Sequence, residues 1–202
     1  SWNLGQRTNN GTMTVFTNNT LNQIVKVGSS SFSYDSNGNL TSDGTSGIAY
    51  TYDDENQLTK AEVPASWKTE FVYDGFRRLR IRREYTYSGG YMLQSETYYI
   101  YDGMRVVQER VGNVPTVSYT RGNDLGGTLE SAGGIGGLLA RSAHSGSTPY
   151  GISSSAFYHA DGNGNVTYLV NVDHSRAAEY RYDPFGKALS SAGTLKDVNV
   201  YR

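Results

Sequence analysis

The stretch FSYDSNGNLT, residues 32–41, contains the residues of a tight β-hairpin in the order that a hairpin needs. Asp35 can accept a hydrogen bond from a backbone N–H group two residues later, and Gly38 can adopt the positive φ that most residues avoid. An aromatic residue two positions before Tyr34 shares its face of a strand, and Leu40 begins a returning strand. The stretch therefore predicts a strand, a turn at Asp35 and a second strand.

The same order of residues returns along the chain, which makes it an internal repeat. Clear copies are YTYDDENQLT (50–59), FVYDGFRRLRI (71–81), YIYDGMRVVQE (99–109) and YRYDPFGKAL (180–189), and FYHADGNGNVTYL (157–169) is a degenerate copy. A unit of roughly 20 residues forms one hairpin, which must pack against its neighbours because it cannot bury its apolar face alone. The residues expected to build the turns are Tyr34, Asp35, Gly38, Tyr52, Asp53, Tyr73, Asp74, Tyr101, Asp102, Asp161, Gly164, Tyr182, Asp183, Pro184 and Gly186.

These units predict an all-β fold of stacked antiparallel hairpins. We expect the motif aromatics of neighbouring hairpins to form rows of cross-strand pairs that hold the register: Phe32/Tyr34, Tyr50/Tyr52, Phe71/Tyr73, Tyr99/Tyr101 and Tyr180/Tyr182. The turn at Asp183 is the best formed, since Pro184 presets φ and Gly186 occupies the fourth position. Asp74 and Asp102 are each followed directly by glycine, which predicts a different turn type at both.

The chain is expected to be a single repeat-built β domain over residues 1–202. Residues 1–30 carry weak repeats and one or two strands, and residues 31–121 carry the dense repeats. Residues 122–156 form a glycine-rich irregular segment packed on the sheet, and residues 157–202 hold the closing repeats. A β-propeller is the alternative fold, but its blades repeat evenly at ~40–50 residues, whereas this repeat is shorter and uneven.

Composition narrows the range of possible functions. The net charge is −1, which favours no nucleic-acid partner, and the absence of cysteine excludes disulfides and thiolate chemistry. The longest apolar stretch, GGIGGLLA (133–140), is shorter than the ~20 residues of a membrane-spanning helix, and no signal peptide is evident. We expect no membrane span and no cofactor.

Several groups of residues could form a catalytic or metal-binding site, but each is explained more simply by its structural role in a turn. His159 and Asp161 could form a general-base pair, yet no nucleophile accompanies them at a recognised spacing. The stretches at 35–41 and 161–167 resemble half of a calcium loop but lack its glycine at position six and its final glutamate. Asp53, Asp54 and Glu55 diverge in a turn, unlike a glycosidase pair.

RRLRIRRE (77–84) could form a nucleic-acid patch, but it reads better as a charge-paired strand face. Leu79 and Ile81 would face the packed side, with Arg78, Arg80, Arg82 and Glu84 on the other, and the expected cross-strand partners are Glu62, Glu70 and Glu96. The sequence therefore predicts no catalytic, cofactor-binding or metal-ligating residue.

Taken in order, the Y-x-Y-D units, GNDLGGTLESAGGIGGLLA (122–140), FYHADGNGNV and the closing YRYDPFGKAL resemble an RHS or YD-repeat protein over nearly the whole chain. The resemblance implies a curved β-strip that forms part of a larger hollow shell. In bacterial RHS toxins, including the C components of ABC toxins, such a shell encloses a C-terminal toxin, and in the related teneurins it serves cell-surface adhesion.

The resemblance also implies partners and a location. The partners would be the remainder of the chain's own shell polypeptide and an enclosed toxin, and open sheet edges would favour self-association. The protein would be secreted or displayed at the cell surface. The chain stops at DVNVYR (197–202), where the family core continues, so no catalytic residue is carried over.

Two other functions remain open at this stage. An adhesion or glycan-binding module would use exposed aromatic residues such as Trp67, and a contiguous exposed aromatic patch would favour it. A hydrolase would need two converging carboxylates or a histidine-based pair in a cleft.

Overall fold

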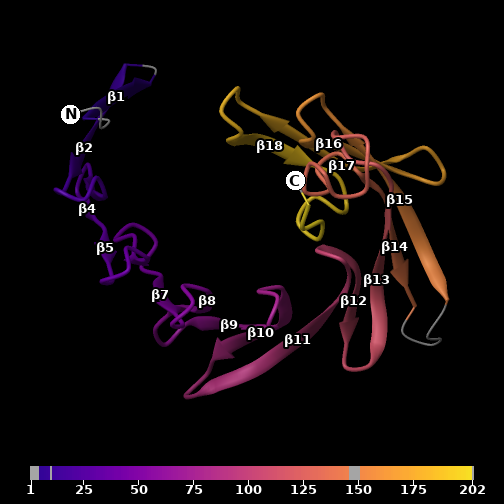
Figure 1. Ribbon diagram of the computed structural model, residues 1–202, viewed down its shortest axis with the longest axis horizontal. Helices are drawn as coiled ribbons and strands as arrows, with labels where there is room; N and C mark the ends of the chain where they lie inside the picture. Colours follow the sequence, from indigo (N-terminus) through magenta and orange to yellow (C-terminus); the bar gives the residue numbers. More distant parts are fainter. Residues whose placement is uncertain (1–4, 10, 146–150, 202) are drawn as a thin grey trace. The chain divides into compact units, whose positions relative to one another are not determined.

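The computed structural model describes residues 5–9, 11–145 and 151–201, which are built from β-strands and turns without a helix (Figure 1). The chain divides into two compact units, Ser1–Glu96 and Thr97–Arg202. The single domain expected over residues 1–202 stays a prediction.

The first unit contains the shorter strands. They are β1 Gln6–Asn9, β2 Thr12–Asn18, β3 Ile24–Val27, β4 Ser30–Ser31, β5 Ser33–Tyr34, β6 Leu40–Ser42, β7 Ala49–Tyr52, β8 Leu58–Val63, β9 Trp67–Tyr73 and β10 Leu79–Tyr87. Strand β11, Tyr91–Asp102, runs across the boundary between the units. The second unit continues with β12 Arg105–Val111, β13 Val114–Arg121, β14 Leu138–His144, β15 Ile152–Ala160, β16 Val166–Asn171, β17 Arg176–Tyr182 and β18 Ala188–Ala192.

The strands follow one another in sheet order as they do in the sequence. Strands β1 to β4 form a four-stranded sheet, and β5 to β18 form a fourteen-stranded antiparallel sheet. This confirms the all-β fold of stacked antiparallel hairpins. Because neighbouring strands are consecutive and antiparallel, every second connection within a unit lies at the same edge. The loops at Asp35, Asp53 and Asp74 therefore share one edge of the first unit, and those beginning at Asp102, Gly122, Asp161 and Asp183 share one edge of the second.

Two predictions are wrong, one about the number of strands in residues 1–30 and one about where the glycine-rich segment ends. The first 30 residues contain β1, β2, β3 and the start of β4 rather than one or two strands, because even weakly alternating polar stretches such as β1 pair with a neighbour. The irregular glycine-rich backbone ends at residue 137, not 156, because Leu138–His144 pairs with both β13 and β15. Residues 146–150 of the predicted segment lie outside the described residues.

The two units differ in how much they bury. Among the described residues of the first unit, Ala61 is the only apolar side chain counted as buried. The second unit has a core on one sheet face, made of Ala156, Tyr158, Val166, Leu169, Ala177, Ala178 and Tyr180. The first unit is thus a single layer, whose stability depends on neighbour-to-neighbour contacts in the sheet.

Residues 193–201, here called the C-terminal strap, cover part of this core. The Leu195 N–H donates to the Ala177 carbonyl at 2.8 Å, which fixes the start of the strap against β17. Asn199 is fully buried and accepts a hydrogen bond from the Tyr158 hydroxyl at 2.6 Å. Burial raises the pKa of Tyr158, so its hydroxyl stays protonated and can donate. The Tyr201 ring lies edge-on to that of Tyr119 at 5.0 Å.

Candidate functional site: the repeated tyrosine–aspartate turns

The Asp35 loop is closed by hydrogen bonds to both the backbone and the carboxylate of Asp35. Its N–H donates to the Asn39 carbonyl at 3.0 Å, and its carbonyl accepts from the Gly38 N–H at 3.1 Å. Its Oδ1 accepts from the N–H groups of Asn37 and Asn39, both at 2.9 Å. This is a three-residue hairpin loop whose third residue is left-handed, and Gly38 has φ +89°.

The loops at Asp53, Asp74, Asp161 and Asp183 repeat this geometry. In each, the aspartate Oδ1 accepts from the N–H groups two and four residues later, over 2.9–3.1 Å. Five carboxylates in the described chain therefore stabilise their loops through the same pair of hydrogen bonds. The hydrogen bonds expected from Asp35 and the positive φ expected of Gly38 are both present.

The third loop position is left-handed even where it is not glycine. Gly38, Gly164 and Gly186 have φ between +83° and +89°, but Asn56 and Arg77 occupy the same position with φ +62°. The different turn type predicted at Asp74 is therefore wrong: Gly75 is not used for its flexibility, and Arg77 takes the left-handed position. The prediction is confirmed at Asp102, which pairs with Arg105 across a two-residue connection with Gly103 at φ +59°.

Sequence reasoning missed three further loops of this kind, which begin at Asn19, Asp124 and Asn171. Each has the same backbone bonds, and the left-handed residues are Asn22, Gly127 and His174. The Asn19 side chain accepts from the N–H groups of Leu21 and Gln23 at 2.9 and 3.0 Å. The available signal was Asp or Asn followed three residues later by Gly, Asn or His, without the preceding tyrosine.

Three motif tyrosines connect their hairpin to the one before it. The hydroxyls of Tyr34, Tyr73 and Tyr182 donate to the carbonyls of Ile24, Leu58 and Val166 at 2.8, 2.9 and 3.0 Å. In all three cases the acceptor lies five residues after the Asx residue of the preceding loop. Burial raises the pKa of Tyr73, which keeps its hydroxyl protonated for this role.

The predicted cross-strand aromatic pairs are wrong. Tyr52 pairs with Leu58, Tyr73 with Leu79 and Tyr182 with Ala188, each beside a register shift. Motif strands alternate with return strands, so motif aromatics of successive hairpins are two strand spacings, roughly 9.5 Å, apart. The tyrosine hydroxyl spans this gap where a ring pair cannot.

Neighbouring loops also bond to one another along the edge of the first unit. Asn56 Oδ1 accepts from the side-chain amides of Asn37 and Asn39 at 3.0 and 2.8 Å. Glu55 of the same loop forms an ion pair of 3.4 Å with Arg77 of the next. The first three tyrosine–aspartate loops thus form one laterally linked row.

The glycine-rich segment also bonds to a neighbouring loop at the edge of the second unit. The buried Asp124 carboxylate accepts from the N–H groups of Gly126, Ala132 and Gly134 at 2.9, 2.5 and 3.1 Å, which holds the segment in a compact form. Glu130 of the segment bonds to Arg105 and to the Met104 N–H, both at 3.0 Å. The glycine-rich segment, which the sequence predicts to be irregular backbone packed on the sheet, is thus bonded through Glu130 to the two-residue connection that follows Asp102.

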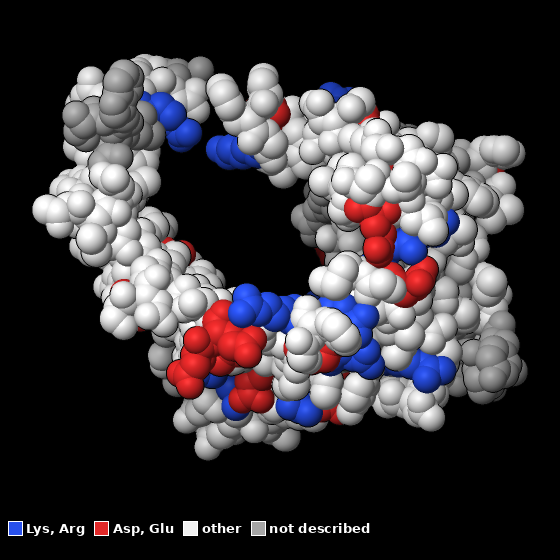
Figure 2. Space-filling view, viewed as in Figure 1, with Lys and Arg blue, Asp and Glu red and all other residues white. Residues whose placement is uncertain are grey.

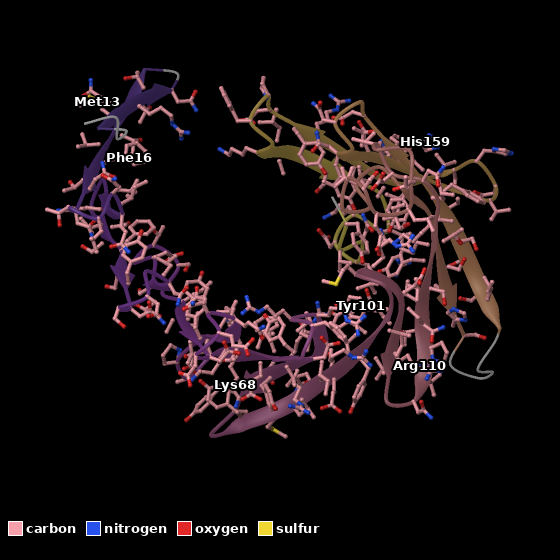
Figure 3. All side chains as sticks on the ribbon, viewed as in Figure 1. Met13, Phe16, Lys68, Tyr101, Arg110 and His159 are labelled. Atoms are coloured by element: carbon pink, nitrogen blue, oxygen red, sulfur yellow. The ribbon has the colours of Figure 1, made fainter. Side chains whose placement is uncertain are left out.

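Charged side chains of the first unit are paired rather than gathered by sign. Glu96 pairs with Arg83, as a cross-strand partner should, but Glu62 and Glu70 bond to Lys60 and Lys68 instead of arginines. The strand pairing nevertheless places Arg83 directly opposite Glu70, where its charge contributes to the lowered pKa of Glu70 after the larger effect of Lys68. Lys68, which is labelled in Figure 3, also lies 4.3 Å from the centre of the Tyr85 ring. Acidic and basic surfaces adjoin one another in this region (Figure 2).

Two of the candidate catalytic carboxylates are engaged in the turns. The Asp161 carboxylate accepts from the N–H groups of Asn163 and Asn165 and from the Asn165 amide. The Asp53 carboxylate accepts from Glu55 and Gln57. Among the described residues, no group of three or more His, Asp or Glu side chains is placed to hold a metal ion, and no helix could span a membrane.

Comparison with known proteins agrees with this geometry. Residues 3–104 match the family described as teneurin YD-shell. The chain is 31% identical over 189 residues to the tRNA3(Ser)-specific nuclease WapA of Bacillus spizizenii and 30% identical to the tRNA nuclease WapA of Bacillus subtilis. Each alignment covers 91% of this chain but only 7% of the relative.

Solved structures show the same fold at low sequence identity. The crystal structure of TcdB2-TccC3 is similar over 81% of this chain and 8% of that chain, with TM-score 0.53 and 13% identity. The Tc holotoxin pore of Photorhabdus luminescens is similar over 94% of this chain and 10% of that chain, with TM-score 0.54 and 12% identity. With its repeated tyrosine–aspartate loops and the match over residues 3–104, the chain belongs to the teneurin YD-shell family of RHS/YD-repeat proteins.

Proposed function

We propose that this chain is a structural segment in the wall of a YD-repeat shell, and that the shell encloses a toxin polypeptide that follows it. The observation that carries the proposal is the row of identical Asx loops joined by tyrosine hydroxyls. Three hairpins are bonded to their predecessors in the same way, so the unit can be added repeatedly to extend a wall.

The wall itself is proposed to have no catalytic activity. The carboxylates of the motif are used by turn N–H groups, which leaves them poorly suited to general acid or base work. The relatives named as tRNA nucleases are far longer, and this chain aligns with 7% of their length. Any nuclease activity of a full-length protein is therefore assigned to another part of the polypeptide.

The proposed location is the cell surface or the exterior, as expected of a YD-repeat shell protein. The proposed partners are the rest of the same shell and the enclosed polypeptide, and open strand edges would favour self-association of an isolated segment. The balanced surface charge of the first unit gives no electrostatic support for nucleic-acid binding by the wall.

The experiment is limited proteolysis of the full-length natural polypeptide, followed by intact-mass measurement. We expect the region after the repeats to be protected from protease while the repeats are folded. Substitution of Gly186 by valine, which strains a loop of the wall, should expose that region, whereas Asp54→Ala should not. Equal digestion of the following region in all three proteins would contradict enclosure.

A further inference from the structure

An open cleft of about 420 Å³ lies in the second unit between the glycine-rich segment and the Asp161 loop. It is lined by residues 133–136 of the glycine-rich segment, by residues 163–166, and by Arg121, Leu138 and Tyr201. Ligand pockets typically have volumes of ~300–1,000 Å³. The cleft is therefore large enough for a small ligand or a short piece of peptide. The hydrogen bonds that close the turns do not require such a cleft.

The charge of the cleft is one-sided. Arg121 is the one charged residue among the described residues that line it, and no aspartate or glutamate takes part. Arg121 forms no ion pair within the part of the chain that the structure describes. Its Nε and Nη2 both donate to the Val106 carbonyl, at 3.3 and 3.1 Å, and the guanidinium also interacts with the Tyr201 hydroxyl, which together use part of its five N–H donors. The remaining donors can serve an anion.

The guanidinium is also held in place before any ligand arrives. It lies 4.9 Å from the centre of the Tyr201 ring and 5.9 Å from that of Tyr119. The Tyr119 hydroxyl donates to Glu109 at 2.7 Å, so that carboxylate is already engaged. A planar, positioned guanidinium favours two-point recognition of a carboxylate.

One part of the wall is apolar, while Asn163 and Asn165 contribute polar side chains elsewhere. Leu138 and Val166 line the cleft, and Ile135 lines it while 54% of its surface remains exposed. A branched apolar side chain next to the anion would cover Ile135 and remove this surface from water. An isolated inorganic anion would leave the apolar wall unused.

We propose that this cleft binds a peptide carboxylate whose neighbouring side chain is branched and apolar, with Arg121 as the carboxylate-binding residue. The carboxylate can be a chain terminus or an acidic side chain, which share the same chemistry. This site goes beyond the role of the chain as a wall segment and does not depend on whether the shell encloses a polypeptide.

The test uses the 202-residue chain with N-acetyl-leucine, its neutral analogue N-acetyl-leucinamide and acetate, followed by amide NMR. N-acetyl-leucine should shift the amides of Gly133, Gly134 and Gly136 and bind about tenfold more tightly than the other two. Equal binding of the neutral analogue would overturn the proposal. Acetate binding as tightly as N-acetyl-leucine would indicate an adventitious ion only.

Variants separate recognition from folding. Arg121→Gln should lower the affinity about tenfold, while Arg176→Gln, at an exposed arginine that does not line the cleft, should leave it unchanged. Because Ile135 is exposed, Ile135→Asp and Ile135→Lys should both fold. Both changes remove the apolar contact, and aspartate also repels the ligand carboxylate, so binding should be weaker with aspartate than with lysine. Equal binding of the two variants would contradict the electrostatic role.

A final pair of probes distinguishes the source of the carboxylate. N-acetyl-glutamyl-leucinamide presents an acidic side chain, and N-acetyl-leucine presents a terminus. Tighter binding of the first assigns the cleft to an acidic side chain within a peptide, and tighter binding of the second assigns it to a chain end. Failure of both to bind would overturn the site while leaving the proposed wall function untouched.

Discussion

The hydroxyl of Tyr182 donates a hydrogen bond of 3.0 Å to the backbone carbonyl of Val166, which lies in the hairpin before its own. Val166 pairs with Ala160 directly beside a register shift, where the regular ladder is interrupted. Tyr34 and Tyr73 make the equivalent bond to the preceding loop. The tyrosine of the motif therefore stabilises the junction between repeats, while the aspartate stabilises the loop within one.

Replacing motif tyrosines by phenylalanine tests this division. Tyr73→Phe and Tyr182→Phe keep the ring but remove the donor, and each should lower the free energy of unfolding by about 0.5–1.5 kcal/mol. The measurement is urea unfolding followed by far-UV circular dichroism. Tyr87→Phe, at an exposed tyrosine of a hairpin end, is the control and should change the free energy by less than about 0.5 kcal/mol. Equal effects at all three positions would contradict the junction role.

The left-handed loop position should tolerate glycine and reject β-branched residues. Gly186 has φ +83° and an added Cβ would meet no atom within 4 Å, so Gly186→Val tests backbone strain without a clash. We expect a loss of about 1–2 kcal/mol or more. Asp54→Ala, in an exposed loop position, should cost less than about 0.5 kcal/mol. Equal melting temperatures of the two variants would count against the strain argument.

At Arg77 the opposite substitution, from a larger residue to glycine, can be tested. Arg77 holds φ +62°, and its ion pair with Glu55 is exposed and therefore worth at most about 0.5 kcal/mol. Arg77→Gly should stabilise the chain by about 0.5–1 kcal/mol, because the left-handed strain is removed. Asn56→Gly should gain less, since Asn56 also accepts from Asn37 and Asn39. Thermal unfolding of both variants checks the order, and a loss on Arg77→Gly would contradict it.

The loop carboxylates should make stability depend on pH in the acidic range. The side-chain amide of Asn165 and the loop N–H groups lower the pKa of Asp161 below its ordinary value of 3.8, and Asn39 does the same for Asp35. A lowered folded-state pKa stabilises the fold fully above pH 3.8, and the contribution is lost as the pH falls through the folded-state value. Melting temperatures should therefore decrease below about pH 4.

A substitution that the chain already uses provides the control for this pH effect. Asn occupies the Asx position at residues 19 and 171 with the same loop geometry. Asp161→Asn should therefore fold and should reduce the dependence of melting temperature on pH. An unchanged pH profile in this variant would remove Asp161 from the titrating set.

Asn199 should control attachment of the C-terminal strap. Asn199→Ala leaves the Tyr158 hydroxyl without its acceptor in a buried place and should cost about 1–3 kcal/mol. Hydrogen exchange should become faster at the Leu195 and Asn199 amides, which bond to Ala177 and Leu195. Val198→Ala, at an exposed residue of the strap, should leave these rates unchanged. Unchanged exchange in Asn199→Ala would mean that the strap is held by its other contacts.

The sequence by itself determined the all-β class, the antiparallel hairpins of the motif and the loops at Asp35, Asp53, Asp161 and Asp183, because Asx hydrogen bonding and positive φ are local properties. The tertiary structure alone decided that Arg77 takes a left-handed position, since closure of the hairpin dictates φ whichever residue is present. It also decided that Tyr182 reaches Val166 and that Arg121 lines a cleft with Tyr201. Those contacts join residues at least 16 positions apart, and only the packing of strands fixes which of them meet.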